Sequence, residues 1–247
     1  MVAAMYYLLN AMPAEKTSFI RLTKSGNLTE SVPDGEERRC IYLLEANETT
    51  PIDITQTYSV GTGSSLFLTI VMLGGSKVSY SLVSTIRGAG GASTIDWIFY
   101  GKEDEKQKIS VRTVFDAKNG SGEIAIHGVA ENRASVDVNG CIEITTNGGG
   151  TNTYLTEKTL MLDPTAKVNA VPGLEIKTND VKASHSASVS KVSGEDLFYF
   201  ASRGISEQEA RRMYVEGFLG SLLERIPDIG MRQEIMGEIA KKYEQKR

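Results

Sequence analysis

Few side chains in this sequence are of the kinds that bind metals or attack substrates. The 247 residues include two histidines and two cysteines. His185 stands in a serine-rich run between Ser184, Ser186 and Ser188, and these short neighbours leave its imidazole within reach of a partner chain. A neutral imidazole is a good ligand for iron and titrates near physiological pH. An isolated histidine on a polar strand face can equally be a hydrogen-bonding surface group, so the residue pattern leaves both roles open.

The two cysteines, Cys40 and Cys141, lie far apart in the sequence. They are too few for a secreted disulfide framework and have no paired spacing for zinc, which favours a reducing, cytosolic compartment. They are also fewer than the four thiolates that typically hold an iron–sulfur cluster. Alternation places Cys141 opposite to Ile142, but no neighbouring cation in the sequence lowers the pKa of its thiol. His127 has no acidic or thiol neighbour at ligand spacing, so we expect it to be structural or exposed.

Acidic residues offer a second kind of chemistry. Polysaccharide-cleaving β-helix enzymes use paired carboxylates in an outer groove, and Asp96, Asp104, Glu105 and Asp116 are the candidates here. The chain has one tryptophan, too few for aromatic sugar platforms, and its start does not have the pattern of a secretion signal. We therefore keep a secreted-type polysaccharide-active enzyme as an alternative function.

Charge and composition exclude further classes. The 27 basic and 31 acidic residues are mixed along the chain and give a formal net charge of −4, so no basic surface predicts a nucleic-acid partner. With 40% hydrophobic residues, the chain can bury a sizeable core. The apolar residues 1–12 have no basic flank and are too short to span a bilayer, so we expect neither a signal peptide nor a membrane anchor.

The elements that position these side chains are strands over most of the chain. From about residue 19 to residue 192, runs rich in β-branched and aromatic residues alternate with turn formers. Later runs, such as residues 134–138 and 142–144, alternate apolar and polar residues, which predicts one buried and one exposed strand face. The glycine-rich runs lack the Lys-Ser/Thr of a phosphate-binding loop and predict turns; they are residues 61–65, 88–91 and 147–150.

Two architectures fit these strands. After residue 140 the apolar runs are only a few residues long and end at turn signals such as Asp163-Pro164 and Pro172-Gly173. Short strands of this kind are typical of stacked rungs in a β-helix, in which neighbouring coils bury a core together. A β-sandwich or jelly roll also has short alternating strands. Because the chain shows no strict repeat, periodicity leaves both open.

At Ser193 the pattern changes from strands to helices. Ser193 is expected to cap a short helix, and Ser206 with Glu209 predicts a capping box for a second one, which Pro227 ends. Asp228 is expected to cap a third helix. We therefore divide the chain into a β-helix core, residues 1–192, and a C-terminal helical domain, residues 193–247. The apolar stripe predicted for the second helix consists of Ala210, Met213, Tyr214, Phe218, Leu219 and Leu222.

A set of motifs near the C-terminus carries a resemblance. Residues 180–189, DVKASHSASV, lead into Asp196-Leu197-Phe198-Tyr199-Phe200 and then into residues 202–206, SRGIS. In the next helix, Glu209-Ala210 and Gly217-Phe218 follow at a fixed interval. These elements resemble the C-terminal signature of the SufB/SufD family of iron–sulfur cluster assembly proteins. The similarity extends upstream to about residue 136.

The resemblance implies a fold and partners. The fold would be mostly β, a right-handed parallel β-helix with a C-terminal α-helical subdomain. The function would be that of a non-catalytic scaffold in the SUF system that binds the ATP-binding-cassette ATPase SufC through its C-terminal helices. A SufB-like subunit or a second copy of the chain would be the other partner. His185 matches the family's rung histidine and would be an iron or cluster ligand, with any iron–sulfur cluster shared at a subunit interface.

The sequence also departs from the family pattern. The SufB branch carries a cysteine in the region of residues 154–159 and an acidic residue after the rung histidine, whereas this chain has no cysteine there and has Ser186. No counterpart of the usual N-terminal helical domain is expected. These differences point to a SufD-like variant in the cytoplasm that does not nucleate a cluster alone.

The helical tail is the expected docking surface for the ATPase. Its apolar faces are larger than a cap on the end of a solenoid needs, although such a cap is the plain alternative. We expect four residues to border the docking surface: Arg203, Glu209, Arg212 and Phe218. An orphan solenoid that serves only protein interaction is a third reading of the chain.

Overall fold

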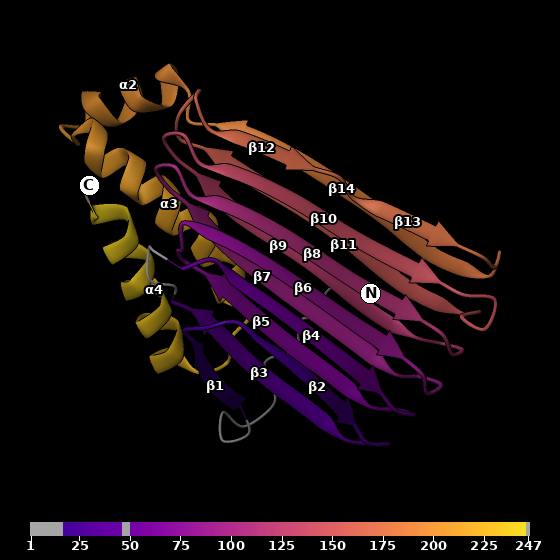
Figure 1. Cartoon of the computed structure of the whole chain (residues 1–247). Coiled ribbons are helices and arrows are strands. Elements are labelled where there is room, and N and C mark those ends of the chain that lie inside the picture. The colour runs from indigo at the N-terminus through magenta and orange to yellow at the C-terminus, as the bar shows by residue number, and fades with distance from the viewer. Residues whose placement is uncertain (1–16, 46–49, 246–247) are drawn as a thin grey trace.

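The computed structural model describes residues 17–45 and 50–245. The expectations for residues 1–12 therefore lie outside the described part of the chain. Strands fill the first three quarters of the described residues, and helices follow (Figure 1). No helix in these ranges is long and apolar enough to cross a membrane.

The strands form two sheets that take alternate strands along the chain. The first, called here the odd sheet, contains β1 (Thr17–Leu22), β3 (Glu37–Leu44), β5 (Ser65–Met72), β7 (Ala92–Gly101), β9 (Ser121–Ala130), β11 (Thr151–Met161) and β14 (Val181–Lys191). The second, the even sheet, contains β2 (Gly26–Val32), β4 (Ile52–Val60), β6 (Lys77–Ile86), β8 (Lys106–Phe115), β10 (Ser135–Ile144), β12 (Lys167–Ala170) and β13 (Gly173–Ile176).

This alternation makes the molecule a β-solenoid. Each coil consists of one strand from each sheet, and hydrogen bonds between equivalent turn residues join positions 28 to 31 residues apart. Every strand pair in the described residues is parallel, for example Ile126 beside Glu157. A sandwich or jelly roll is built from antiparallel sheets. The mostly-β solenoid predicted from the sequence is therefore confirmed.

One corner of each coil repeats the same backbone conformation. Gly35, Gly63, Gly90, Asn119 and Gly150 all have positive φ, between 58° and 78°. Each donates its N–H to a turn carbonyl of the next coil, as Gly63 does to Ala89 at 3.0 Å. Glycine and asparagine tolerate this left-handed conformation best. The predicted glycine-rich turns are all found here, and they stack the coils in register.

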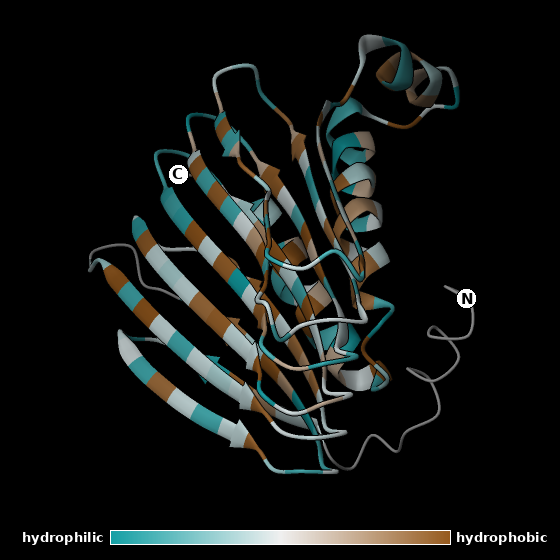
Figure 2. Cartoon of the chain, turned by 90° about the vertical axis from the view of Figure 1, so that its right-hand side faces the viewer, coloured by the Kyte–Doolittle hydropathy of each residue, from teal (hydrophilic) through white to brown (hydrophobic). Residues whose placement is uncertain are grey.

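The interior between the two sheets is the main core. It is filled by large side chains such as Trp97, Tyr42 and Phe115, all almost fully buried. Figure 2 shows the matching alternation of hydrophilic and hydrophobic bands along the strands. The prediction of strands a few residues long after residue 140 is confirmed for β12 and β13, which have four residues each, and was wrong for β11 and β14, which have 11 each. Interior threonine, glycine and glutamate interrupt the apolar pattern without ending the strands.

Three helices follow β14 in the described chain: α2 (Gly194–Ser202), α3 (Glu207–Leu223) and α4 (Ile229–Glu244). Ser193, Ser206 and Asp228 cap them as predicted, each accepting a backbone N–H in the first turn. The full capping box forms at Ser193. At Ser206 only half of it forms, because the Glu209 carboxylate binds Arg212. Helix α3 ends at Leu223, before Pro227.

The helices pack along the solenoid and do not cover its end. In a second core, Val215, Leu219 and Ile235 lie against the outer face of the odd sheet, on residues such as Ile98 and Val129. The antiparallel arrangement of α3 and α4, called here the α3–α4 hairpin, is visible beside the strands in Figure 1. The alternative that the tail only caps the solenoid's end was therefore wrong. Met213, predicted in the apolar stripe, is 43% exposed, and Val215 takes its place.

Candidate functional site

The last coil leaves one strand largely uncovered. β14 lies at the edge of the odd sheet, and among the described strands it pairs with β11 alone. Its residues are exposed from Ser184 onward. An edge of this length presents unpaired backbone N–H and C=O groups that a further strand can bind. Large apolar side chains are exposed at the same end: Val171, Ile176 and Val189, at 51%, 43% and 48%.

His185 lies in the middle of this edge strand. Its register partner on β11 is Leu155, whose side chain is in the solenoid core. Val181 and Ala183 pack against the same core, and neighbours at every second position share a strand face. The imidazole of His185 thus belongs to the interior-facing side of β14, yet it is exposed because no complete coil follows. The structure keeps it accessible, as the sequence predicts.

Glu157 is a charged group on the same side that sequence reasoning missed. It is on β11, beside Ala187 of β14, and only 2% of it is exposed. One carboxylate oxygen accepts the Gly140 N–H at 2.8 Å, and the other has no partner among the described residues. Burial raises the pKa of Glu157 to about 7. The sequence signal for the burial of Glu157 was its place in the strand alternation, two residues after Leu155 and two before the buried Thr159.

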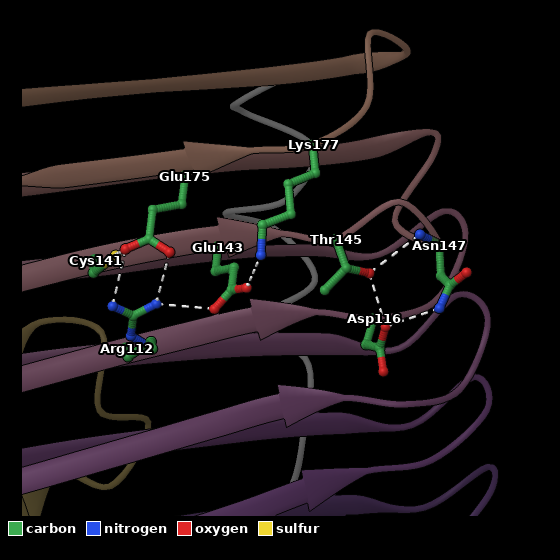
Figure 3. A network of polar contacts seen from close by, with 8 residues as sticks. All are labelled: Arg112, Asp116, Cys141, Glu143, Thr145, Asn147, Glu175 and Lys177. Atoms are coloured by element: carbon green, nitrogen blue, oxygen red, sulfur yellow. Dashed lines mark hydrogen bonds and ion pairs between the residues drawn. The ribbon is translucent and has the colours of Figure 1, made fainter.

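Neither cysteine joins His185. Cys40 is buried in the core of an early coil, and burial raises the pKa of its thiol. Cys141 points outward from β10, as predicted, but Arg112 and Glu175 cover it (Figure 3). Its sulfur lies 3.8 Å from a Glu175 oxygen, and burial raises its pKa as well. The described residues contain no group of three or more potential metal ligands.

The other residues drawn in Figure 3 hold the even sheet together. Arg112 of β8 binds Glu143 of β10 at 2.9 Å and Glu175 of β13 at 3.1 Å. Lys177 binds Glu143 at 2.7 Å. Each of these charges is paired with an opposite charge on another coil, so this surface stabilises the stack of coils.

The candidate carboxylates of a polysaccharide enzyme are not brought together. Asp96 is buried beneath the helices, and Glu105 pairs with the buried Lys242 of α4. Asp104 pairs with Arg133, and Asp116 accepts hydrogen bonds in a coil turn from Thr145 and Asn147. Each acid has its own structural partner.

An aromatic surface lies where α2 meets α3. Phe198 is 75% exposed, Tyr199 58% and Met213 43%. A shallow hollow of about 400 Å³ near Tyr199 is lined by Phe200, Met213, Tyr214, Gly217 and Phe218. We use the name α2–α3 aromatic surface for the side chains of Phe198, Tyr199, Phe200, Met213, Tyr214 and Phe218. Apolar groups grouped this way on a monomer mark an interaction site more often than scattered ones do.

Two of the four residues predicted for docking, Arg203 and Phe218, contact this surface, whereas no contact among the described residues joins Glu209 or Arg212 to it. The Arg203 guanidinium lies over the Tyr199 ring at 5.3 Å. Arg212 is paired with Glu209 at 2.7 Å, so neither presents a free charge. Phe218 lines the hollow, and its ring also stacks on His127 of β9 at 5.3 Å.

His127 has the structural place predicted for it. It is 9% exposed beneath α3, and Ser221 lies 3.4 Å from its Nδ1. Burial, with Lys158 nearby, lowers the pKa of His127 to about 4. The ring is therefore neutral at physiological pH and packs as an aromatic side chain between sheet and helix.

Polar contacts also fasten the hairpin to the sheet. Lys102, in the turn after β7, donates to the Tyr243 carbonyl at 2.6 Å near the end of α4. Arg211 of α3 donates to the Leu162 carbonyl at 2.8 Å. A lysine at a helix C-terminus satisfies carbonyls that have no partner within the helix. These contacts hold the open end of the hairpin, where α3 begins and α4 ends.

Parallel coils with an open last coil and a helical hairpin along one sheet define a class, a β-solenoid with an exposed edge strand. The family model described as "SUF system FeS cluster assembly, SufBD core domain" matches residues 41–218, and the chain belongs to this family. The predicted family membership is confirmed.

Individual relatives agree with this family. The chain is 30% identical over 159 residues to the iron–sulfur cluster assembly protein SufD of Bacillus subtilis, covering 64% of this chain and 36% of that protein. It is 35% identical over 104 residues to SufD of Escherichia coli, covering 42% and 25%. A SufBD family protein of Mycobacterium tuberculosis is 26% identical over 232 residues, covering 90% and 58%. The chain thus spans less than two thirds of the length of each of these relatives.

Proposed function

We propose that this chain is a non-catalytic scaffold subunit of the SUF system that holds a SufC-type ATPase and a second scaffold chain. Its family supports involvement in iron–sulfur cluster assembly. The observation that carries the finer proposal is the presence of two separate exposed surfaces, the α2–α3 aromatic surface and the β14 edge. The cysteine content supports a reducing, cytoplasmic setting.

The ATPase binds at the α2–α3 aromatic surface. Phe198 and Tyr199 supply large apolar area at its centre, and buried aromatic anchors dominate the energy of most interfaces. Arg203, which lies over the Tyr199 ring, forms part of the polar rim, and the Arg212–Glu209 pair on α3 is expected to extend it. The Phe218 ring of α3 stacks on His127 of the odd sheet, so a movement of the docked ATPase would be transmitted to the solenoid.

The second scaffold chain, a SufB-like subunit or another copy of this chain, binds at the last coil. Backbone groups of β14 pair with a strand of that chain, and Val189, Ile176 and Val171 bury their exposed area against it. A sheet that continues across two chains needs no new fold in either.

An iron–sulfur cluster is the cargo of this assembly, and His185 is the ligand that this chain contributes. Both cysteines are buried on other coils and are unsuited to the same site. A cluster needs about four ligands, so the partner chain supplies the rest. Its place is therefore the interface along β14.

The ATPase site is tested by co-purification with SufC. We expect Phe198→Asp to abolish binding, and the double variant Arg212→Glu, Phe218→Asp to do the same. Ile229→Asp is the matched control, because Ile229 is also exposed, at 64%, and lies on α4 outside this surface. Binding that survives Phe198→Asp would sink this placement.

The cargo is tested by anaerobic purification after co-expression with SufC and a SufB-like chain, with iron, sulfide and stoichiometry measured. His185→Ala should lower the iron and sulfide content while the protein complex stays intact. Unchanged iron with His185→Ala would remove the ligand role. A chain that recruits no SUF component would leave a solenoid used for other protein interactions.

A further inference from the structure

A buried charge cluster lies beneath the turn of the α3–α4 hairpin. Arg225, between the two helices, donates to Asp96 of β7 at 2.9 Å. Its guanidinium also donates to both oxygens of Glu123 on β9, at 3.1 and 3.2 Å. Asp96 is 5% exposed, and both acids stand on the outer face of the odd sheet. The contacts bridge two neighbouring strands and the helical turn.

The charges in this cluster do not balance. Arg39 of β3 lines the same small cavity, but its guanidinium lies over the Phe67 ring at 4.1 Å and binds Glu37 at 3.3 Å. The cavity walls from β5, from β7 itself and from the turn add no titratable side chain beyond those named. Two carboxylates thus share one close cation among the described residues. A carboxylate buried with too little positive charge is neutralised most readily by a proton.

We propose that Asp96, Glu123 and Arg225 form a proton-linked latch for the α3–α4 hairpin. Asp96 holds a proton while the hairpin lies on the odd sheet, and the proton passes to water when the hairpin lifts and Asp96 becomes hydrated. Glu123 keeps its ion pair with Arg225 in the closed state. The latch works without any partner, so its test is independent of the proposed ATPase docking.

The direction of the pH effect follows from burial. Desolvation raises the pKa of Asp96 from 3.8 to about 7, although Arg225 opposes the shift. The closed hairpin therefore binds more protons than the open one, and closure is strongest at low pH. It weakens as pH rises through about 7. Between pH 6 and pH 8 these pKa values give a change of about tenfold in the opening equilibrium.

Hydrogen exchange of the full chain measures this opening. Amide protection in α3 and α4, corrected for the intrinsic pH dependence of exchange, should fall about tenfold from pH 6 to pH 8. In Asp96→Asn the protection should not change with pH, because asparagine does not titrate. Glu157→Gln is the control: it removes the other buried acid with a raised pKa, far from the hairpin turn, and should keep the tenfold change.

Two results would overturn the latch. One is equal corrected protection of α3 and α4 in the wild type at pH 6 and pH 8. The other is an Asp96→Asn variant that retains the wild-type pH dependence. If circular dichroism shows that Asp96→Asn does not fold, Glu123→Gln is the second test. In that variant Arg225 pairs with Asp96 alone and lowers its pKa, so the pH-dependent loss of amide protection must move to lower pH. An unmoved transition in Glu123→Gln would also reject the latch.

Discussion

The middle coils and the last coil are built from strands of nearly equal length but have opposite surroundings. β9 has 10 residues, and nearly all of them are buried. β14 has 11, and most of them are exposed. The difference has two causes: β9 is followed by another coil, and the α3–α4 hairpin covers its outer face, whereas β14 has neither in the described chain. Strands of similar length therefore form core in the middle of the stack and an exposed surface at its end.

A substitution in the middle coils should have the largest effect on stability. Ile126 of β9 is 1% exposed, between Trp97 and Glu157 in the interior row of the odd sheet. Ile126→Ala removes three carbon atoms from a packed core and should lower the free energy of unfolding by about 2 to 5 kcal/mol. Urea denaturation measures the loss. Ile126→Val, expected to lose about 1 kcal/mol, is the control for a small cavity.

The pH dependence of stability tests whether β11, the strand next to β14, is still closed to water. A carboxylate that reached water through the open last coil would keep an ordinary pKa, whereas the burial of Glu157 raises its pKa from 4.5 to about 7. The folded state then binds the proton more tightly than the unfolded state. The contribution of Glu157 to stability is greatest below pH 4.5 and is lost as pH rises through about 7, a change of up to about 3 kcal/mol.

Glu157→Gln should remove that part of the pH dependence. Urea unfolding at pH 5 and pH 8 gives the difference between wild type and variant. The raised pKa of Asp96 affects both proteins equally, so it cancels in the comparison. Parallel pH profiles for the two proteins would show that the last coil admits water to Glu157, and the contrast between the regions would weaken.

The sequence contains a signal that distinguishes the two sheets. Odd-sheet strands have nearly continuous apolar runs, such as residues 41–44, and even-sheet strands such as residues 77–86 alternate. Continuous runs are typical of strands that are buried on both faces. The pattern thus predicts which sheet the helices cover. Helix caps at Ser193 and Asp228 were predicted correctly because capping is local chemistry.

Other features depend on contacts between distant segments and could not be predicted. The stripe of α3 indicates that one of its faces is buried, but it does not identify which residues of the odd sheet that face contacts. The burial of Glu157 follows from the register of β11 with β9 and β14, which no single strand encodes. The exposure of His185 likewise depends on the stack ending after β14.

The opposite end of the solenoid provides a smaller test. Tyr42 of β3 and Tyr58 of β4 join their hydroxyl groups across the interior at 2.7 Å, and both are buried. Tyr58→Phe leaves the Tyr42 hydroxyl without this partner and should lower the free energy of unfolding by about 1 to 2 kcal/mol. The double variant Tyr42→Phe, Tyr58→Phe should recover part of the loss. A loss near zero in Tyr58→Phe would mean that water enters this end and replaces the hydrogen bond.

The smallest effect on stability is expected in the last coil. Val189 of β14 is 48% exposed, so Val189→Ala should change the free energy of unfolding by less than about 0.5 kcal/mol. The same substitution at Val111, which is fully buried in β8, should lower it by about 2 kcal/mol. Val189→Lys, with equally little effect on stability, should reduce binding of the second scaffold chain, because a charge would enter an apolar interface. Equal losses in Val189→Ala and Val111→Ala would show that the isolated chain already covers its last coil, and β14 would then be unable to serve as the pairing edge.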